Sequence, residues 1–219
     1  MFDSGISVKD LVDELKNTEV DIALDIPDKT YAEWLNALQQ LLYSEIIKEQ
    51  RKIPLVPPQT STIPIDSLPI ESNENKVRFE DIMAIYAEDN NTVPASHKQL
   101  LKSSVASGVI FPDTYYKDNN NIGYNTTHKP TKLHIVYIVK PALVTCNEDN
   151  NIKQKDANNK PINVMVPVEF IELVKAKLRG EAYKLANEDS IAAKWLNDYN
   201  VLLETFKLWL DGKSSKFGI

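Results

Sequence analysis

The segment 167–211 constrains the fold most strongly, because it predicts two long amphipathic helices with almost no loop between them. Asn187 favours the end of the first helix, and Asp189 or Ser190 can cap the second. Both helices carry apolar residues at spacings of three and four, which places these side chains on one helical face. A face this apolar must pack against other helices or against another copy of the chain. Its members are Ile171, Val174, Leu178, Ala182 and Leu185 in the first helix, and Ala192, Trp195, Tyr199, Leu202, Phe206 and Trp209 in the second.

Two stretches near the N-terminus predict helices that can cover this face. A short helix is expected from Ser7 to Asn17, and a longer one from Asp28 to about Arg51. Residues 1–52 and 161–219 are therefore expected to form one helical bundle. The contact expected inside the bundle joins Trp195 and Phe206 to Leu35, Leu38 or Leu42.

The middle of the chain differs in composition from both ends. Residues 53–75 hold prolines at positions 54, 57, 58, 64 and 69, and this density disfavours helix and favours extended backbone. The simplest interpretation is a linker. The same segment is rich in Ile, Leu and Val, however, which favours an arm that lies along a neighbouring subunit.

Residues 76–160 predict a β-rich insertion. Residues 76–88 are strand-like, Ser96 to Ser107 predicts a short helix, and residues 147–160 predict a polar loop. The strongest predicted strand covers residues 133–139, and the side chains on its apolar face are Leu133, Ile135, Tyr137 and Val139. The predicted fold class is α+β, mainly α: a helical bundle from the N-terminal helix and the C-terminal helical hairpin, with a β-rich insertion in the middle.

Charge and composition exclude several classes of protein. The net charge is −6 and the isoelectric point is near 5.2, whereas proteins that wrap nucleic acid are normally basic. No stretch approaches the roughly 20 apolar residues of a membrane helix. The N-terminal residues show no signal-peptide pattern, and the single cysteine, Cys146, excludes an intramolecular disulfide. We therefore expect a soluble chain with no membrane partner.

The sequence contains no familiar motif for catalysis, cofactor binding or metal binding. Its glycines form neither a dinucleotide-binding fingerprint nor a phosphate-binding loop. His97, His128 and His134 have spacings that suit no common metal site, and His134 is interpreted as a strand-surface residue. Cys146 has no basic neighbour in the sequence and is interpreted as an inert thiol. These observations predict no catalytic residue, no cofactor and no metal.

An enzyme would have to assemble its site from scattered carboxylates, for example Glu80, Asp81 and Asp113. Glu80 and Asp81 are adjacent in a strand-like stretch, so they are expected to point to opposite faces. Nothing in the spacing of the three residues supports a shared site. The prediction is that the protein is not an enzyme.

Three short segments occur in an order that is typical of one family. Residues 34–38 read Trp-Leu-Asn-Ala-Leu, and residues 133–143 read Leu-His-Ile-Val-Tyr-Ile-Val-Lys-Pro-Ala-Leu. Residues 166–170 then read Val-Pro-Val-Glu-Phe and open the C-terminal helical pair. Over roughly residues 7–210, this order resembles the head-to-tail adaptor, or connector ring, proteins of tailed bacteriophages, especially those of short-tailed and crAss-like phages.

The resemblance implies a structural protein of the virion, made in the cytoplasm of the host bacterium. It implies a ring of identical subunits, twelve-fold by resemblance, between the portal protein and a tail or second ring protein. DNA would leave the capsid through this ring without sequence-specific binding, and a negatively charged subunit suits such a channel. Two alternatives stay open: a monomeric protein-interaction module that binds through its β insertion, and another phage tail-completion protein.

The last residues of the chain form the candidate partner-binding site. The final helix is expected to end at Asp211-Gly212 and to leave a short polar tail. One interpretation is a frayed terminus. The other is that the tail docks on the portal, as the resemblance implies, through two lysines beside two apolar anchors. The candidate residues are Lys213, Lys216, Phe217 and Ile219.

Overall fold

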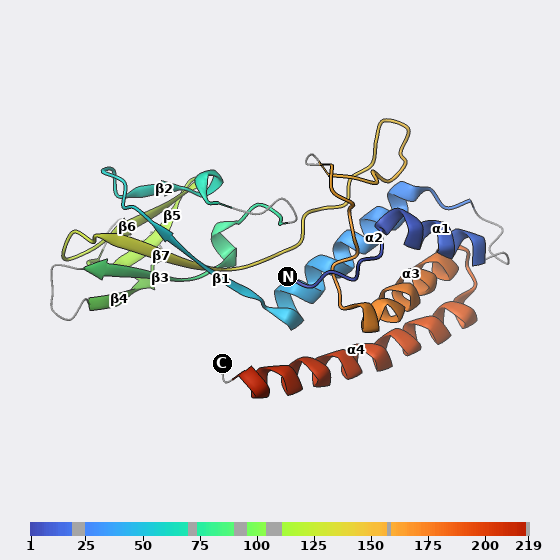
Figure 1. The fold of residues 1–219 in the computed structure, drawn as a ribbon. Coiled ribbons are helices and arrows are strands. Elements are labelled where there is room, and N and C mark those ends of the chain that lie inside the picture. The colour runs from blue at the N-terminus through green and yellow to red at the C-terminus, as the bar shows by residue number, and fades with distance from the viewer. Residues whose placement is uncertain (19–24, 70–73, 90–95, 104–110, 157–158, 218–219) are drawn as a thin grey trace. The chain divides into compact units, whose positions relative to one another are not determined.

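The computed structural model describes residues 1–18, 25–69, 74–89, 96–103, 111–156 and 159–217. The chain divides into two compact units, which are visible in Figure 1. The helical unit comprises residues 1–47 and 141–219, and the β unit comprises residues 48–140. Both ends of the chain therefore contribute to the helical unit, whereas the β unit is one continuous segment.

The described part of the helical unit contains four α-helices, α1 (Val8–Thr18), α2 (Asp28–Leu41), α3 (Ile171–Leu185) and α4 (Asp189–Phe217). A π-helical turn, η1 (Leu42–Ile47), follows α2, and a 3-10 turn, η5 (Val168–Phe170), leads into α3. The prediction that the helix from Asp28 continues to about Arg51 was wrong. Lys48 has a left-handed φ of 49°, and strand β1 (Gln50–Leu55) begins two residues later.

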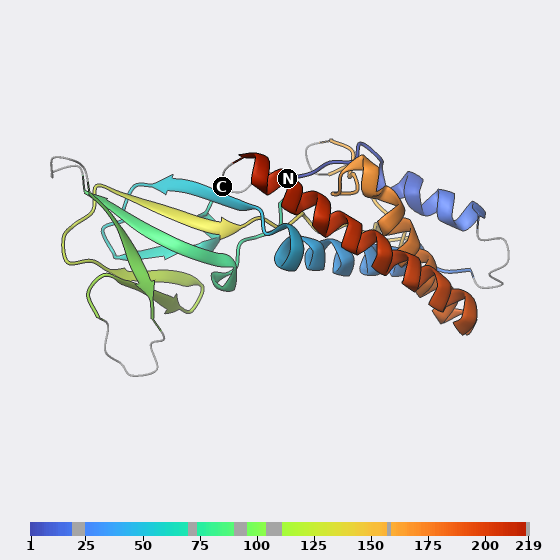
Figure 2. The ribbon, with the colours of Figure 1, turned by 90° about the horizontal axis from the view of Figure 1, so that it is seen from below.

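The helices α3 and α4 form a hairpin with a very short connection, as predicted (Figures 1 and 2). Asn187 closes α3 in a left-handed conformation with φ 61°. The amide of Glu188 donates to the carbonyl of Tyr183 at 2.9 Å, which completes the hydrogen-bond pattern of a left-handed helix cap. Gly180 lies where α3 meets α4, and a Cβ there would come within 2.7 Å of the Leu196 side chain. The missing side chain therefore allows the two helices to approach closely.

The inner face of α4 is the one that the sequence predicted. Ala192, Tyr199 and Phe206, spaced by seven residues, are buried on this face. Phe206 lies in an aromatic cluster with Phe170 and Trp209, at ring-centroid distances of 4.7 Å and 5.9 Å. The predicted burial of Phe206 is thus confirmed. Trp195 is only partly buried, and the guanidinium of Arg179 lies over its ring, 4.7 Å from the centroid. The buried core that Phe206 joins also contains Leu35, Leu38, Leu42, Val174 and Leu178.

The polar segment 147–160 is anchored to the helical unit. Cys146 and Ile152 form an isolated antiparallel bridge, and Ile152 is buried in the helical core. The amide of Ile152 donates to the carboxylate of Asp28 at 3.2 Å. This buried carboxylate also accepts hydrogen bonds from Lys16 at 2.7 Å and Lys9 at 3.2 Å. The start of α2 therefore holds this segment in place.

The described part of the β unit is a seven-stranded, curled sheet with the strand order β1-β7-β3-β4-β5-β6-β2 (Figures 1 and 2). Its pairs are antiparallel except β4 with β5. The predicted apolar face of β7 is confirmed, since Leu133, Ile135, Tyr137 and Val139 are all buried. Strands other than β1 are β2 (Thr62–Pro64), β3 (Ile82–Asp89), β4 (Ser96–Lys102), β5 (Thr114–Asp118), β6 (Asn121–Asn125) and β7 (Lys132–Ile138).

The proline-rich segment from residue 53 is part of this sheet. Pro54 lies in β1 and Pro64 in β2, and these strands are the two edges of the sheet. An edge strand tolerates proline because one side of its backbone has no ladder partner. Ile53, Ile63 and Ile65 are buried, which accounts for the apolar composition of the segment. The described strands of this segment therefore belong to the chain's own sheet and are not a solvated linker.

The short helix predicted from Ser96 to Ser107 was also wrong. Residues 96–102 form β4, while residues 104–107 lie outside the described part. Leu100 is buried and Leu101 is 69% exposed, which is the alternation of a strand and not the shared face of a helix. The two neighbouring strands satisfy the backbone of β4 and override its local helix signals.

These strands overturn the predicted fold class. The chain was expected to be mainly α, with a β-rich insertion in a helical bundle. Instead, residues 48–140 form a compact β unit with its own sheet and its own buried residues. The helical unit is the second compact unit of the chain. The sequence overestimated the helical content of the chain. Whether a segment forms an edge strand or a central strand depends on the distant strands that pair with it.

We expect Phe206→Ala to lower the free energy of unfolding by about 3–5 kcal/mol, because it removes a fully buried ring from the aromatic cluster. Asn200→Ala is the control on the same helix, since Asn200 is exposed, and its effect should stay within about 0.5 kcal/mol. Chemical denaturation monitored by circular dichroism measures both. Equal stability of the two variants would contradict the packing of α4 described above.

Candidate functional site

The outer face of α4 carries an uncharged strip, which we call the α4 strip, formed by Val201, Thr205, Leu208 and Gly212. All four residues are exposed, Val201 by 59% and Leu208 by 72%. Their spacings of four, three and four residues place them in one line along the helix. The hydroxyl of Thr205 donates to the carbonyl of Val201 at 3.0 Å, so the strip offers no unsatisfied hydroxyl donor. Burying the strip against another surface therefore costs little free energy for the desolvation of polar side chains.

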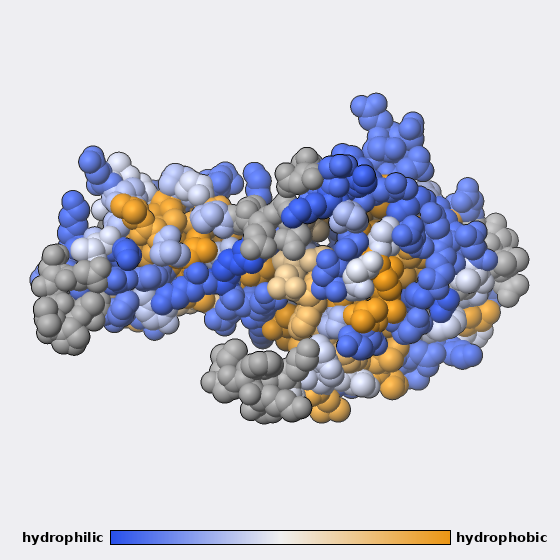
Figure 3. Space-filling model, viewed as in Figure 1, coloured by the Kyte–Doolittle hydropathy of each residue, from blue (hydrophilic) through white to orange (hydrophobic). Residues whose placement is uncertain are grey.

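Charged side chains flank the α4 strip. Glu204 and Lys207 pair with each other at 2.7 Å, and Lys194 is exposed on the preceding part of the same face. Figure 3 shows hydrophobic side chains reaching the surface of the helical unit among hydrophilic ones. The spacing of the strip is that of a helix–helix seam, with Thr205 and Gly212 as small residues that permit close approach. A packing contact with another helix is what this surface can provide.

The sequence-predicted partner residues follow directly after the strip. The sequence predicted that the final helix ends at Asp211-Gly212. This was wrong, because α4 continues through Gly212 to Phe217. The backbones of Lys213, Lys216 and Phe217 therefore belong to the helix, and their side chains lie outside the description. Ile219 lies outside the described residues altogether. The structure thus replaces the expected free tail, up to Phe217, with further helical turns.

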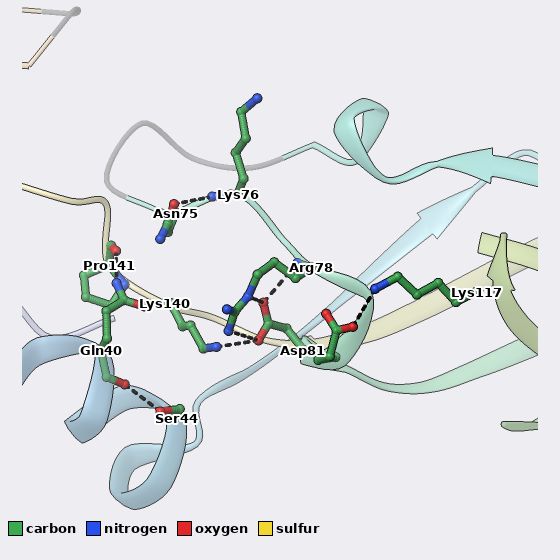
Figure 4. A network of polar contacts seen from close by, with 10 residues as sticks. Gln40, Ser44, Asn75, Lys76, Arg78, Asp81, Lys117, Lys140 and Pro141 are labelled. Carbon is green, nitrogen blue, oxygen red and sulfur yellow. Dashed lines mark hydrogen bonds and ion pairs between the residues drawn. The ribbon is translucent and has the colours of Figure 1, made fainter. Parts of the chain in front are cut away.

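The β unit contains a buried ion pair that the sequence did not reveal (Figure 4). Asp81 is 5% exposed and accepts a hydrogen bond from the Nζ of Lys140 at 2.5 Å. It also accepts from the backbone amide of Arg78 at 3.0 Å and from the Arg78 guanidinium at 3.3 Å. Burial by itself would raise the pKa of Asp81, but the hydrogen bonds from Arg78 and Lys140 outweigh burial and lower it. The carboxylate stays ionised at neutral pH as a structural group.

Lys140 is the last residue of the β unit, and Pro141 is the next residue along the chain. The Lys140 carbonyl accepts from the amide of Asn75 at 2.7 Å, within the β unit. The Pro141 carbonyl accepts from the side chain of Gln40 at 2.9 Å, within the helical unit (Figure 4). The Lys-Pro step that contributed to the family resemblance is thus fixed in both units by named hydrogen bonds.

We expect Asp81→Ala to destabilise the β unit by about 3 kcal/mol or more, because it leaves the buried Lys140 ammonium without its partner. Glu80→Ala is the matched control, since Glu80 pairs with Lys117 on the surface and such pairs contribute at most about 1 kcal/mol. Urea unfolding of the two variants measures the difference. A loss in Glu80→Ala as large as in Asp81→Ala would mean that burial of the pair is not the cause.

The carboxylates considered for an enzymatic site pair with different lysines. Glu80 pairs with Lys117, Asp81 with Lys140, and Asp113 with Lys98 at 2.6 Å. Asp113 also accepts from the hydroxyl and the backbone amide of Thr127. The Lys98 ammonium and Thr127 lower the pKa of Asp113 to about 2, so this carboxylate is a weak base. Each of the three acids serves a different local contact.

The depressed pKa of Asp113 predicts a defined pH dependence of stability. A carboxylate whose pKa falls on folding stabilises the fold above its ordinary pKa of 3.8, and this contribution disappears as the pH falls toward about 2. Wild type should therefore exceed Asp113→Asn in stability above about pH 5, with the difference shrinking at lower pH. Urea unfolding over a pH series tests this, and a difference that is constant with pH would contradict it.

The sheet brings together two histidines that looked unrelated in the sequence. Glu88 in β3 lies directly opposite His97 in β4, and Tyr86 in β3 lies opposite His134 in β7. Because side chains two residues apart share a face, all these residues lie on one side of the sheet. The Nε2 of His134 is 2.5 Å from the Oε2 of Glu88. His128 does not belong to this group, and only strand register, which the sequence does not specify, places its members together.

Cys146 is partly buried, and burial raises the pKa of its thiol. A raised pKa lowers the thiolate fraction, so the thiol is a poor nucleophile. In the described residues, no helix is both long enough and apolar enough to cross a bilayer.

Two comparisons with known proteins found no match. No family model matches the chain, and no curated protein matches its sequence.

Proposed function

We propose that the protein is a structural subunit that assembles in many copies into an adaptor ring of a phage virion. In this proposal the ring lies in the neck between portal and tail and surrounds the channel through which DNA leaves. The observation that carries the proposal is the α4 strip, an uncharged line of exposed residues on a long helix. A surface of this kind supports packing between copies and provides no catalytic groups.

The strip suits a repeated contact between subunits. Full burial of an aliphatic side chain contributes about 1.5–3 kcal/mol, so burying Val201 and Leu208 at each interface gives a modest contact. In a ring, every subunit uses the same two surfaces, and closure multiplies this modest contact by the number of copies. The second surface, on the neighbouring copy, would have to present an apolar counterpart to the strip.

The order of the elements also supports the proposal. Helices α1 and α2 come first, and a β unit follows that ends at Lys140, after β7. Pro141 and Ala142 come next, and residues 166–170 then lead into the α3–α4 hairpin. This series of segments is the one that resembles the adaptor proteins. The net charge of −6 agrees with a channel that polyanionic DNA passes without adhering.

The C-terminal residues extend the proposal to the portal. Lys213 and Lys216 add positive charge to an acidic protein, and Phe217 and Ile219 add apolar groups beside it. Because α4 continues through Phe217, Lys213, Lys216 and Phe217 follow the α4 strip along the same helix. We place the subunit contact on the strip and the portal contact on the residues after it.

We expect the wild-type protein to self-associate and Leu208→Glu to shift it toward monomer, because a charge in the strip opposes its burial. Asn197→Glu is the matched control, since Asn197 is exposed on the same face of α4 but precedes the strip. Sedimentation velocity over a concentration series measures the distribution. A wild type that stays monomeric at every concentration, or equal dissociation in both variants, would overturn the proposal.

A further inference from the structure

Three adjacent strands of the β unit converge on one group of metal-ligating atoms. Glu88, His97 and His134 each offer one ligand atom, and these atoms all lie within 4.8 Å of one another. The residues come from β3, β4 and β7, which are neighbours in the sheet. Glu88 and His134 are largely buried, with side-chain exposures of 12% and 14%, while His97 is exposed. The group is therefore anchored at its base and open on one side.

We propose that Glu88, His97 and His134 form a binding site for a divalent transition-metal ion, with Zn²⁺ as the representative. Two imidazoles and one carboxylate are a ligand set that zinc and its neighbours in the transition series prefer. Mg²⁺ and Ca²⁺ prefer oxygen ligands, and this group supplies a single carboxylate. The proposal is independent of the assembly function, because it concerns the opposite unit of the chain from the α4 strip.

The distances allow coordination after small side-chain rotations. Ligands about 2.0–2.2 Å from a tetrahedral Zn²⁺ are separated from one another by roughly 3.4 Å. The Glu88 and His134 atoms are now 2.5 Å apart, so they would have to separate slightly. The His97 ring lies 5.9 Å from the His134 ring, measured between centroids, and would have to move inward. His97 is exposed, so its side chain has room for this change.

A hydrogen-bonded pair of Glu88 and His134 is the simpler function of these residues. That pair accounts for two members of the group but gives no role to His97, which lies opposite Glu88 in the strand register. The nearest charged residue by register is Lys132, which faces Glu88 from β7 and is exposed to solvent. A flexible, exposed lysine is a weak obstacle to a cation held by three ligands.

Three protein ligands leave one position of a tetrahedral ion for water or for a group from another molecule. Binding would join β3, β4 and β7 at one point of the sheet. An ion that binds only the folded state also raises its apparent stability. The site therefore predicts a metal-dependent rise in the melting temperature of the full chain.

The test uses the full chain, free of any histidine tag and stripped of metal with chelator. Titration with ZnCl₂ by calorimetry should show one equivalent bound, and Zn²⁺ should raise the melting temperature. His97→Ala and Glu88→Gln should each weaken binding about tenfold or more, because a lost ligand costs at least as much as a lost supporting contact. His97 is exposed, so its replacement should leave the metal-free melting temperature unchanged.

Two control variants locate the binding. His128→Ala removes an exposed histidine of the β unit, and Cys146→Ser removes the thiol of the helical unit. Both should bind Zn²⁺ as the wild type does. The proposal is overturned if no saturable binding occurs, if His97→Ala binds as tightly as the wild type, or if either control loses the ion. An equal stabilisation by Mg²⁺ would overturn the assignment to a transition metal.

Discussion

The aromatic cluster of Phe170, Phe206 and Trp209 is the contact on which the position of the α4 strip depends. The ring centroids of Phe206 and Trp209 lie 4.7 Å and 5.2 Å from that of Phe170. These contacts hold α4 against η5, the turn that leads into α3. Fixing one face of a helix also fixes the face that points away from it. The orientation of α4 set by Phe206 therefore leaves Val201 and Leu208 exposed and creates the α4 strip.

In the β unit, a proline-rich segment forms part of a sheet. Pro54 and Pro64 occupy the two edge strands, where a missing amide breaks no ladder between central strands. The central strands β7, β3 and β4 pair without proline, and the register of β3 with β4 places Glu88 opposite His97. The strand order of one sheet thus explains both the positions of the prolines and the proximity of Glu88, His97 and His134.

Sequence reasoning succeeded where local periodicity decides the structure. The alternating residues of β7, the left-handed Asn187 and the burial of Phe206 all follow from patterns within a few turns or residues. It failed for residues 53–65 and 96–102, because the edge or centre of a sheet is set by distant strands. The Glu88–His97–His134 group was missed for the same reason, since strand register has no signature in histidine spacing.

The central claim is that the α4 strip is a contact between copies in a ring. Electron cryomicroscopy of the purified full chain tests this most directly, because it reports both the assembly and the place of α4 in it. The account predicts closed rings in which Val201 and Leu208 are buried against a neighbouring copy. Isolated single chains, or rings in which these two side chains face solvent, would contradict it.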